Sequence, residues 1–144
     1  MDFHDKPNEL DFKVFKELAK FGYSPSTLRQ SYHSLQTLHD FIQFIGTHQY
    51  YSDTVNKKIF LLGLDADYAV ISLEQLMLKE KNFVDAVQKA LILKAKPGVD
   101  KKKLDDFKAS VEKLEENVLE LSEQAKRLIL QIREEFQTRQ ALPR

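Results

Sequence analysis

The sequence predicts an all-α protein, a four- or five-helix bundle built on a long antiparallel helical hairpin. Apolar residues recur in steps of three and four through the last third of the chain, which is the coiled-coil spacing of core positions on a helix. Only four Gly and four Pro occur in 144 residues, of which 31% are charged, a composition that favours helices over a β-sandwich. Lys96-Pro97-Gly98 then separates two long helical segments.

The last helix is expected to run from a cap at Asp100 to about Ala141. At about 1.5 Å per residue it would be roughly 60 Å long, whereas a compact domain of this size has a radius of gyration of only about 15 Å. The helix therefore requires a long antiparallel neighbour or must extend beyond its domain. Its expected core positions are Leu104, Phe107, Val111, Leu114, Val118, Leu121, Ala125, Leu128 and Ile132.

Two helices are expected before residue 47. Residues 1–7 form a short arm, and a first helix runs from about Asn8 to Phe21, where Gly22 supplies a stop. Ser24 is placed as an N-cap, with proline in the first turn that follows. The helix that it opens is expected to reach about Gly46.

The segment from residue 47 to 65 allows two interpretations. A short helix capped by Ser52-Asp53 can end at Gly63, with Asp65 capping the next helix. Alternatively, one bent helix runs from 53 to 95. The apolar set after Asp65 is wide, which predicts contact with more than one neighbouring helix.

The chain length fits a single domain. We expect one helical domain over residues 1–144, in which the N-terminal helices occupy 8–64 and the long hairpin occupies 65–141. No internal repeat or low-complexity segment divides it.

Charge and cysteine content limit the function classes. The chain has 22 basic and 22 acidic residues, so its net charge gives no overall attraction to nucleic acid or to an anionic membrane. The absence of cysteine excludes disulfides, thiolate catalysis and cysteine-based zinc sites. The first residues lack the order of a secretory signal, and no apolar stretch approaches the roughly 18 residues of a membrane span. We expect a cytoplasmic protein that does not bind a membrane.

The histidines do not have the spacing of metal ligands. His33 and His39 are six residues apart and diverge on a helix, and no glutamate precedes a histidine by three positions. Arg29 and His33 resemble the Arg/His motif of the helical HEPN ribonucleases, but with at least one intervening residue fewer. We therefore expect no metal, no cofactor and no enzymatic activity.

Residues 17–30 carry a second possible function. The stretch Glu17 to Arg29 has a Gly–apolar–Ser turn followed by Thr-Leu-Arg, and it resembles the helix-turn-helix at the start of regulators of the MerR type. In such regulators the second helix enters the major groove of DNA. The resemblance implies that Ser26, Thr27, Arg29 and Gln30 contact DNA. A small DNA-binding regulator is therefore the alternative function.

The main functional prediction concerns the last helix. Four apolar residues lie beside its principal seam, and either another helix of the same chain or a partner can cover them. They are Leu119, Ile129, Leu130 and Phe136. Exposed apolar patches commonly mark interfaces. We therefore predict a non-enzymatic helical protein–protein interaction or oligomerisation module, which forms a homodimer or binds a protein partner through these residues.

Five lysines surround the turn of the hairpin, at positions 94, 96 and 101–103. They could form a docking patch or only a solvated turn. The sequence does not decide between the two.

Overall fold

The computed structural model describes residues 9–47, 51–96 and 98–141, and the predicted arm at 1–7 lies outside these ranges. The described residues form four helices and no strand: α1 (Glu9–Lys20), α2 (Ser26–Gly46), α3 (Asp53–Ile92) and α4 (Lys101–Ala141). The prediction of an all-α helical bundle is confirmed. Within the described residues, no helix is both long and apolar enough to span a bilayer.

Each of the three later helices begins with a side-chain cap. Ser24 Oγ accepts a hydrogen bond from Ser26 N at 3.3 Å, and Ser52 Oγ accepts one from Val55 N at 3.2 Å. Asp100 Oδ1 accepts from Lys102 N at 3.0 Å and Lys103 N at 3.3 Å. These oxygens satisfy backbone donors that have no partner inside the first turn.

Two helices end in the same hydrogen-bonding pattern. At the end of α1, Tyr23 N donates to Leu18 O at 3.2 Å, and Gly22 has a φ of 76°. At the end of α3, Ala95 N donates to Ala90 O at 2.9 Å, and Lys94 has a φ of 54°. This is the Schellman arrangement, whose left-handed residue is usually glycine. Lys94 adopts this left-handed conformation although it carries a Cβ atom, which makes that conformation less favourable than for glycine.

Residues 53–65 belong to one continuous helix, as in the second interpretation, and this helix ends at Ile92 instead of at residue 95. The hairpin therefore begins at Asp53. Gly63 does not interrupt the helix. A single glycine costs a helix only about 1 kcal/mol relative to alanine, and α3 is held on both sides of it by buried Leu62 and Ala66. Burial of the neighbouring residues outweighs this local preference.

The chain divides into two compact units. Unit 1 contains α1, the start of α2 to Ser31 and the hairpin segment Ser72–Glu115. Unit 2 contains Tyr32–Ile71 and the chain from Glu116 onward. Each unit has its own buried apolar residues. The single-domain organisation expected from the sequence stays a prediction.

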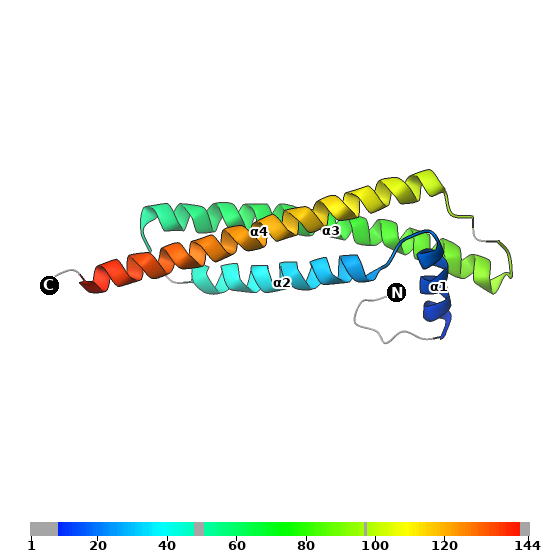
Figure 1. Ribbon diagram of the computed structural model, residues 1–144, viewed down its shortest axis with the longest axis horizontal. Helices are drawn as coiled ribbons and strands as arrows, with labels where there is room; N and C mark the ends of the chain where they lie inside the picture. The colour runs from blue at the N-terminus through cyan, green and yellow to red at the C-terminus, as the bar shows by residue number, and fades with distance from the viewer. Residues whose placement is uncertain (1–8, 48–50, 97, 142–144) are drawn as a thin grey trace. The chain divides into compact units, whose positions relative to one another are not determined.

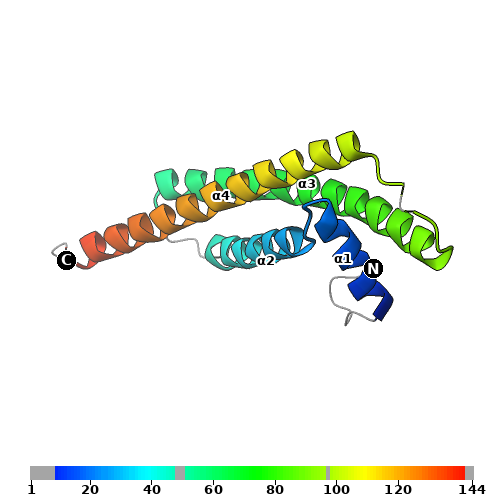
Figure 2. The ribbon, with the colours of Figure 1, turned by 45° about the vertical axis from the view of Figure 1, so that its right-hand side comes forward.

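In unit 1, α1 lies at a steep angle to the second half of α3, with its C-terminal end beside that helix (Figures 1 and 2). Leu18, Leu28 and Leu104 are among its fully buried side chains. The ring of Phe107 lies 5.2 Å from that of Tyr23 and 5.3 Å from that of Phe83, measured between centroids. The pair of Tyr23 and Phe107 is edge-to-face and that of Phe83 and Phe107 is tilted, and such aromatic contacts add to the stabilisation from burial.

Unit 2 is a three-helix arrangement in which α2, the first half of α3 and the second half of α4 lie side by side (Figures 1 and 2). A Cβ atom added at Gly63 would lie 3.7 Å from Ile42 Cγ2, so α2 contacts α3 there. Across the two units, the predicted α4 core positions from Leu104 to Leu128 are all buried, and Ile132 is half-buried. The α4 core positions predicted from sequence thus lie in the interior of the bundle.

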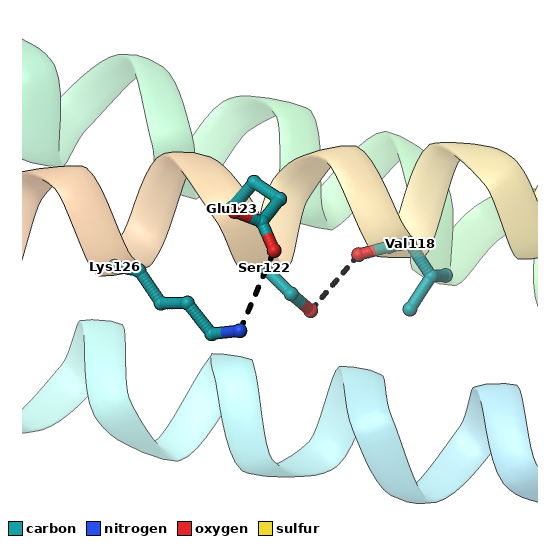
Figure 3. Close-up of polar contacts among 4 residues, drawn as sticks. All are labelled: Val118, Ser122, Glu123 and Lys126. Atoms are coloured by element: carbon teal, nitrogen blue, oxygen red, sulfur yellow. Dashed lines mark hydrogen bonds and ion pairs between the residues drawn. The ribbon is translucent and has the colours of Figure 1, made fainter.

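Two polar contacts beside the seam of α4 lie within α4 itself (Figure 3). Ser122 Oγ donates to Val118 O at 3.0 Å, which satisfies the hydroxyl next to the apolar core. Lys126 Nζ lies 3.4 Å from Glu123 Oε1 on the exposed side. An exposed pair of this kind contributes little stability, so apolar burial dominates the packing of α4.

Candidate interaction surface

The largest unexplained feature of unit 2 is an apolar surface on α3. Five large side chains within twelve residues are each between 41% and 69% exposed. We call this set the outer face of α3, and it consists of Phe60, Leu61, Leu64, Tyr68 and Ile71. Single exposed apolar residues are ordinary on protein surfaces, whereas a contiguous group of this size marks a candidate interface.

Helical geometry explains why these residues cannot reach the core. At 3.6 residues per turn, the outer face lies roughly 180° around α3 from the residues that contact the bundle. The buried positions of this half of α3 are Val55, Ile59, Leu62, Ala66 and Ala69. The helix therefore has two apolar stripes, and only one of them is covered within unit 2.

A groove adjoins the outer face on the side nearest α4. It has a volume of about 350 Å³, and Leu61 lines it while also belonging to the outer face. Its other lining residues are Lys58, Leu62, Asp65, Gln124, Arg127, Leu128 and Gln131. Leucines supply its apolar lining, and amides and charged groups surround them. Such a groove suits a side chain with an apolar body and a polar end.

Two hydrogen bonds join α4 to α3 and to Ser52, the residue that caps α3. Lys58 Nζ donates to Gln131 Oε1 at 2.6 Å. Ser52 Oγ donates to Glu135 Oε1 at 2.5 Å, while the buried Oε2 of Glu135 has no hydrogen-bond partner among the described residues. Glu135 occupies the next core position after Ile132, so a polar contact replaces an apolar one as the seam ends. The bond between Lys58 and Gln131 joins two residues that line the groove, one from each helix.

The four interface residues predicted on α4 are all exposed, between 39% and 64%. They do not form one patch. Leu119 and Leu130 lie on the side of α4 opposite its seam, whereas Ile129 and Phe136 flank the seam. A role for them in an interface stays a prediction. The outer face of α3 was not predicted from the sequence; the helical spacing of Phe60, Leu64, Tyr68 and Ile71 is the signal that identifies it.

The residues of the DNA-binding alternative lie in unit 1, at the start of α2. Ser26 and Gln30 are exposed, while Thr27 and Arg29 are half-buried. Burial raises the pKa of the Glu80 carboxyl group, and the positive charge of Arg29 partly opposes that rise. Arg29 thus has an electrostatic role inside the fold, and DNA contact by these four residues stays a prediction.

A buried polar pair in unit 1 had no signal in the sequence. Tyr23 and Glu80 are each 4% exposed, and the Tyr23 hydroxyl donates a hydrogen bond to Glu80. Desolvation raises the pKa of Glu80, and the hydrogen bond from Tyr23 and the charge of Arg29 partly oppose that rise. Burial and the neighbouring carboxylate raise the pKa of Tyr23. These two groups come from segments 57 residues apart, so only the fold brings them together.

The lysine-rich turn adjoins a second cavity, within unit 1. It has a volume of about 510 Å³, and it is lined by Lys79, Lys103, two aromatic rings and two aspartates among others. Asp100 in its wall is already the cap of α4. Charges of both signs surround this cavity, and they select no ligand class. Among the described residues, no group of three or more His, Asp or Glu side chains is placed to hold a metal ion.

Comparison with known proteins finds no matching family model, no matching curated protein and no matching solved structure. The molecule is an all-α helical-bundle protein. Its function is therefore inferred from its own surface.

Proposed function

We propose that this protein is a non-enzymatic helical protein–protein interaction module that binds its partner through the outer face of α3. The observation that carries the proposal is the exposure of five large apolar side chains within residues 60–71. Transfer of apolar surface out of water stabilises association by roughly 25 cal/mol per Å² before entropic costs are counted. Burial of this surface against a partner can therefore supply favourable free energy of binding.

The outer face of α3 is favoured over the four α4 residues because its exposed apolar side chains lie close together on one side of a helix. Phe60 and Tyr68 are aromatic, and aromatic side chains are enriched at the centres of interfaces. Leu119 and Leu130 are eleven residues apart on α4, with charged residues between them. Those two leucines fit the edge of an interface better than its centre.

Site-specific photo-crosslinking in cells of the native organism tests the proposal. A benzophenone amino acid replaces Tyr68 on the outer face of α3, and Leu119 on α4 in a second variant. Gln43, which is exposed on α2 in the same unit, is the matched control. We expect a discrete protein adduct from position 68 that position 43 does not give.

Equal, diffuse labelling from positions 68 and 43 would contradict the proposal. An adduct from position 119 alone would move the interface to the residues first predicted on α4. The cytoplasmic location expected from the sequence stays a prediction, and the cellular fraction that holds the adduct provides its test.

A further inference from the structure

We propose that the partner of the outer face of α3 is the same face of a second copy, packed antiparallel, with Tyr68 of each copy in the groove of the other. The inference rests on the proposed function, because it names the partner of that surface. It uses only residues of unit 2: the outer face of α3 and the groove of about 350 Å³ beside it.

The spacing of the outer face suits a twofold axis. A twofold interface needs a patch that is complementary to itself, so that residue i contacts j and j contacts i. Phe60 and Ile71 lie at nearly equal distances along α3 from a point near residue 66, and so do Leu64 and Tyr68. In an antiparallel pair each aromatic ring therefore faces an aliphatic side chain. Such pairing avoids opposing two rings of equal bulk across the axis.

The groove lies on the side of α3 that this symmetry requires. Counted at 3.6 residues per turn, Tyr68 and Leu61 lie about 80–100° around α3 from Phe60, in the same direction. A twofold axis perpendicular to two antiparallel helices brings their equivalent sides together. Tyr68 of the second copy then lies beside Leu61 and Asp65, which line the groove.

The groove also matches tyrosine chemically. Leu61, Leu62 and Leu128 provide apolar contact for the ring. Gln124 and Arg127 carry donors that can reach a phenolic oxygen, and both line the groove. Tyr68 is itself 69% exposed, so its ring is available. An apolar ring with a polar end is a frequent anchor at protein interfaces.

The exposed area is enough for a small, specific dimer. Each large side chain has roughly 200 Å² of surface, and the five of the outer face expose about half of theirs. Two copies would then bury on the order of 1,000 Å² from these side chains alone, which is the lower limit of specific interfaces. The walls of the two grooves add to this area.

Sedimentation analysis of the purified full chain tests the dimer over roughly 1–200 μM, a range that detects micromolar association. We expect the mass to approach twice the 16.8 kDa of the chain. Leu64→Glu should give monomers, and Tyr68→Ala should weaken the dimer by about tenfold or more. Leu119→Glu introduces the same charge at another exposed leucine and should leave the association constant within about twofold. Circular dichroism of each variant verifies that it is folded.

A single spin label tests the antiparallel arrangement, because the chain has no cysteine of its own. Lys57→Cys places the label on α3, outside the five residues of the outer face. The two labels of an antiparallel dimer should lie roughly 25–30 Å apart, at 1.5 Å per residue over about 18 residues. A label separation below roughly 15 Å would indicate parallel helices and would overturn this arrangement.

The two levels of the proposal fail separately. A chain that stays at 16.8 kDa at every concentration, while position 68 crosslinks to a different protein in cells, overturns the homodimer and leaves the interaction module standing. A dimer that Leu119→Glu dissociates and Leu64→Glu does not would overturn both, because α4 would then be the interface.

Discussion

The hydroxyl of Tyr23 donates a hydrogen bond to the carboxylate of Glu80 in the interior of unit 1, where both side chains are 4% exposed. The ring of Tyr23 also packs edge-on against Phe107. Tyr23 thus joins the α1–α2 turn to α3 by a polar contact and to α4 by an apolar one. A buried carboxylate in a helical core is expensive unless it is hydrogen-bonded.

This pair predicts a pH dependence of stability. Because the pKa of Glu80 is raised in the folded state, the folded protein binds this proton more readily than the unfolded chain does. The group therefore adds stability at pH values below its unfolded pKa, and that contribution is lost as the pH rises through the folded pKa. Glu80→Gln should melt at a higher temperature than the wild type at neutral pH, and the difference should shrink on acidification. Glu112→Gln, at an exposed position of α4, is the control. A difference that grows toward acid pH would refute this account.

The seam of α4 predicts a contrast between two leucines. Leu114 is 4% exposed and Leu119 is 64% exposed. Leu114→Ala should lower the free energy of unfolding by about 2–5 kcal/mol, because it removes buried contacts and leaves a cavity. Leu119→Ala should change it by less than about 0.5 kcal/mol. Urea unfolding measures both, and equal losses would show that the seam is not the core.

The two Schellman ends predict substitutions of opposite sign. Gly22→Ala should cost about 1 kcal/mol, because it places a Cβ on a residue with a φ of 76°. Lys94→Gly should stabilise the protein by up to about 1 kcal/mol, because it relieves the same conformation at a φ of 54°. Gly98→Ala is the control, since a Cβ there meets no atom within 4 Å. Thermal melting of the three variants measures these effects. A loss of stability in Lys94→Gly would contradict the prediction that its left-handed conformation is unfavourable.

Gly63 predicts a stabilising substitution inside α3. An alanine there has the better helix propensity by about 1 kcal/mol. Its Cβ would meet Ile42 Cγ2 at 3.7 Å, which is ordinary van der Waals contact. Gly63→Ala should therefore raise the melting temperature. A lower melting temperature would mean that the added Cβ atom forces α2 and α3 apart.

The start of α2 separates the two predicted functions. Ser24→Ala should cost about 1 kcal/mol, because Ser24 Oγ caps the helix. Arg29→Ala should cause a measurable loss of stability, because the positive charge of Arg29 partly offsets the cost of burying the Glu80 carboxylate. Fluorescence anisotropy with duplex DNA at several salt concentrations tests the alternative. Salt-sensitive binding by the wild type, lost in Arg29→Ala, would favour the DNA-binding regulator.

Local and periodic features predicted α1, α2 and α4, whereas the start of α3 allowed two interpretations until its packing was known. The three-four spacing from Leu104 to Leu128 identified a seam that is buried throughout, because a helix that packs lengthwise needs an apolar contact on every turn. Ser24, Asp100 and Gly22 predicted helix ends because caps and left-handed turns depend on residues close in the sequence.

Only the tertiary structure decided which apolar stripe is covered and which polar groups meet. Residues 60–71 carry two stripes of similar hydrophobicity on α3, and their sequence does not say which one faces the bundle. Packing buries Leu62 and Ala66 and leaves Phe60 and Tyr68 exposed. Likewise, Tyr23 and Glu80 come from different elements, and their contact follows from the arrangement of α1, α3 and α4 within unit 1. Local sequence determines where α1, α2 and α4 begin and end, whereas competition among helix faces for a limited core determines which apolar stripe of α3 stays exposed.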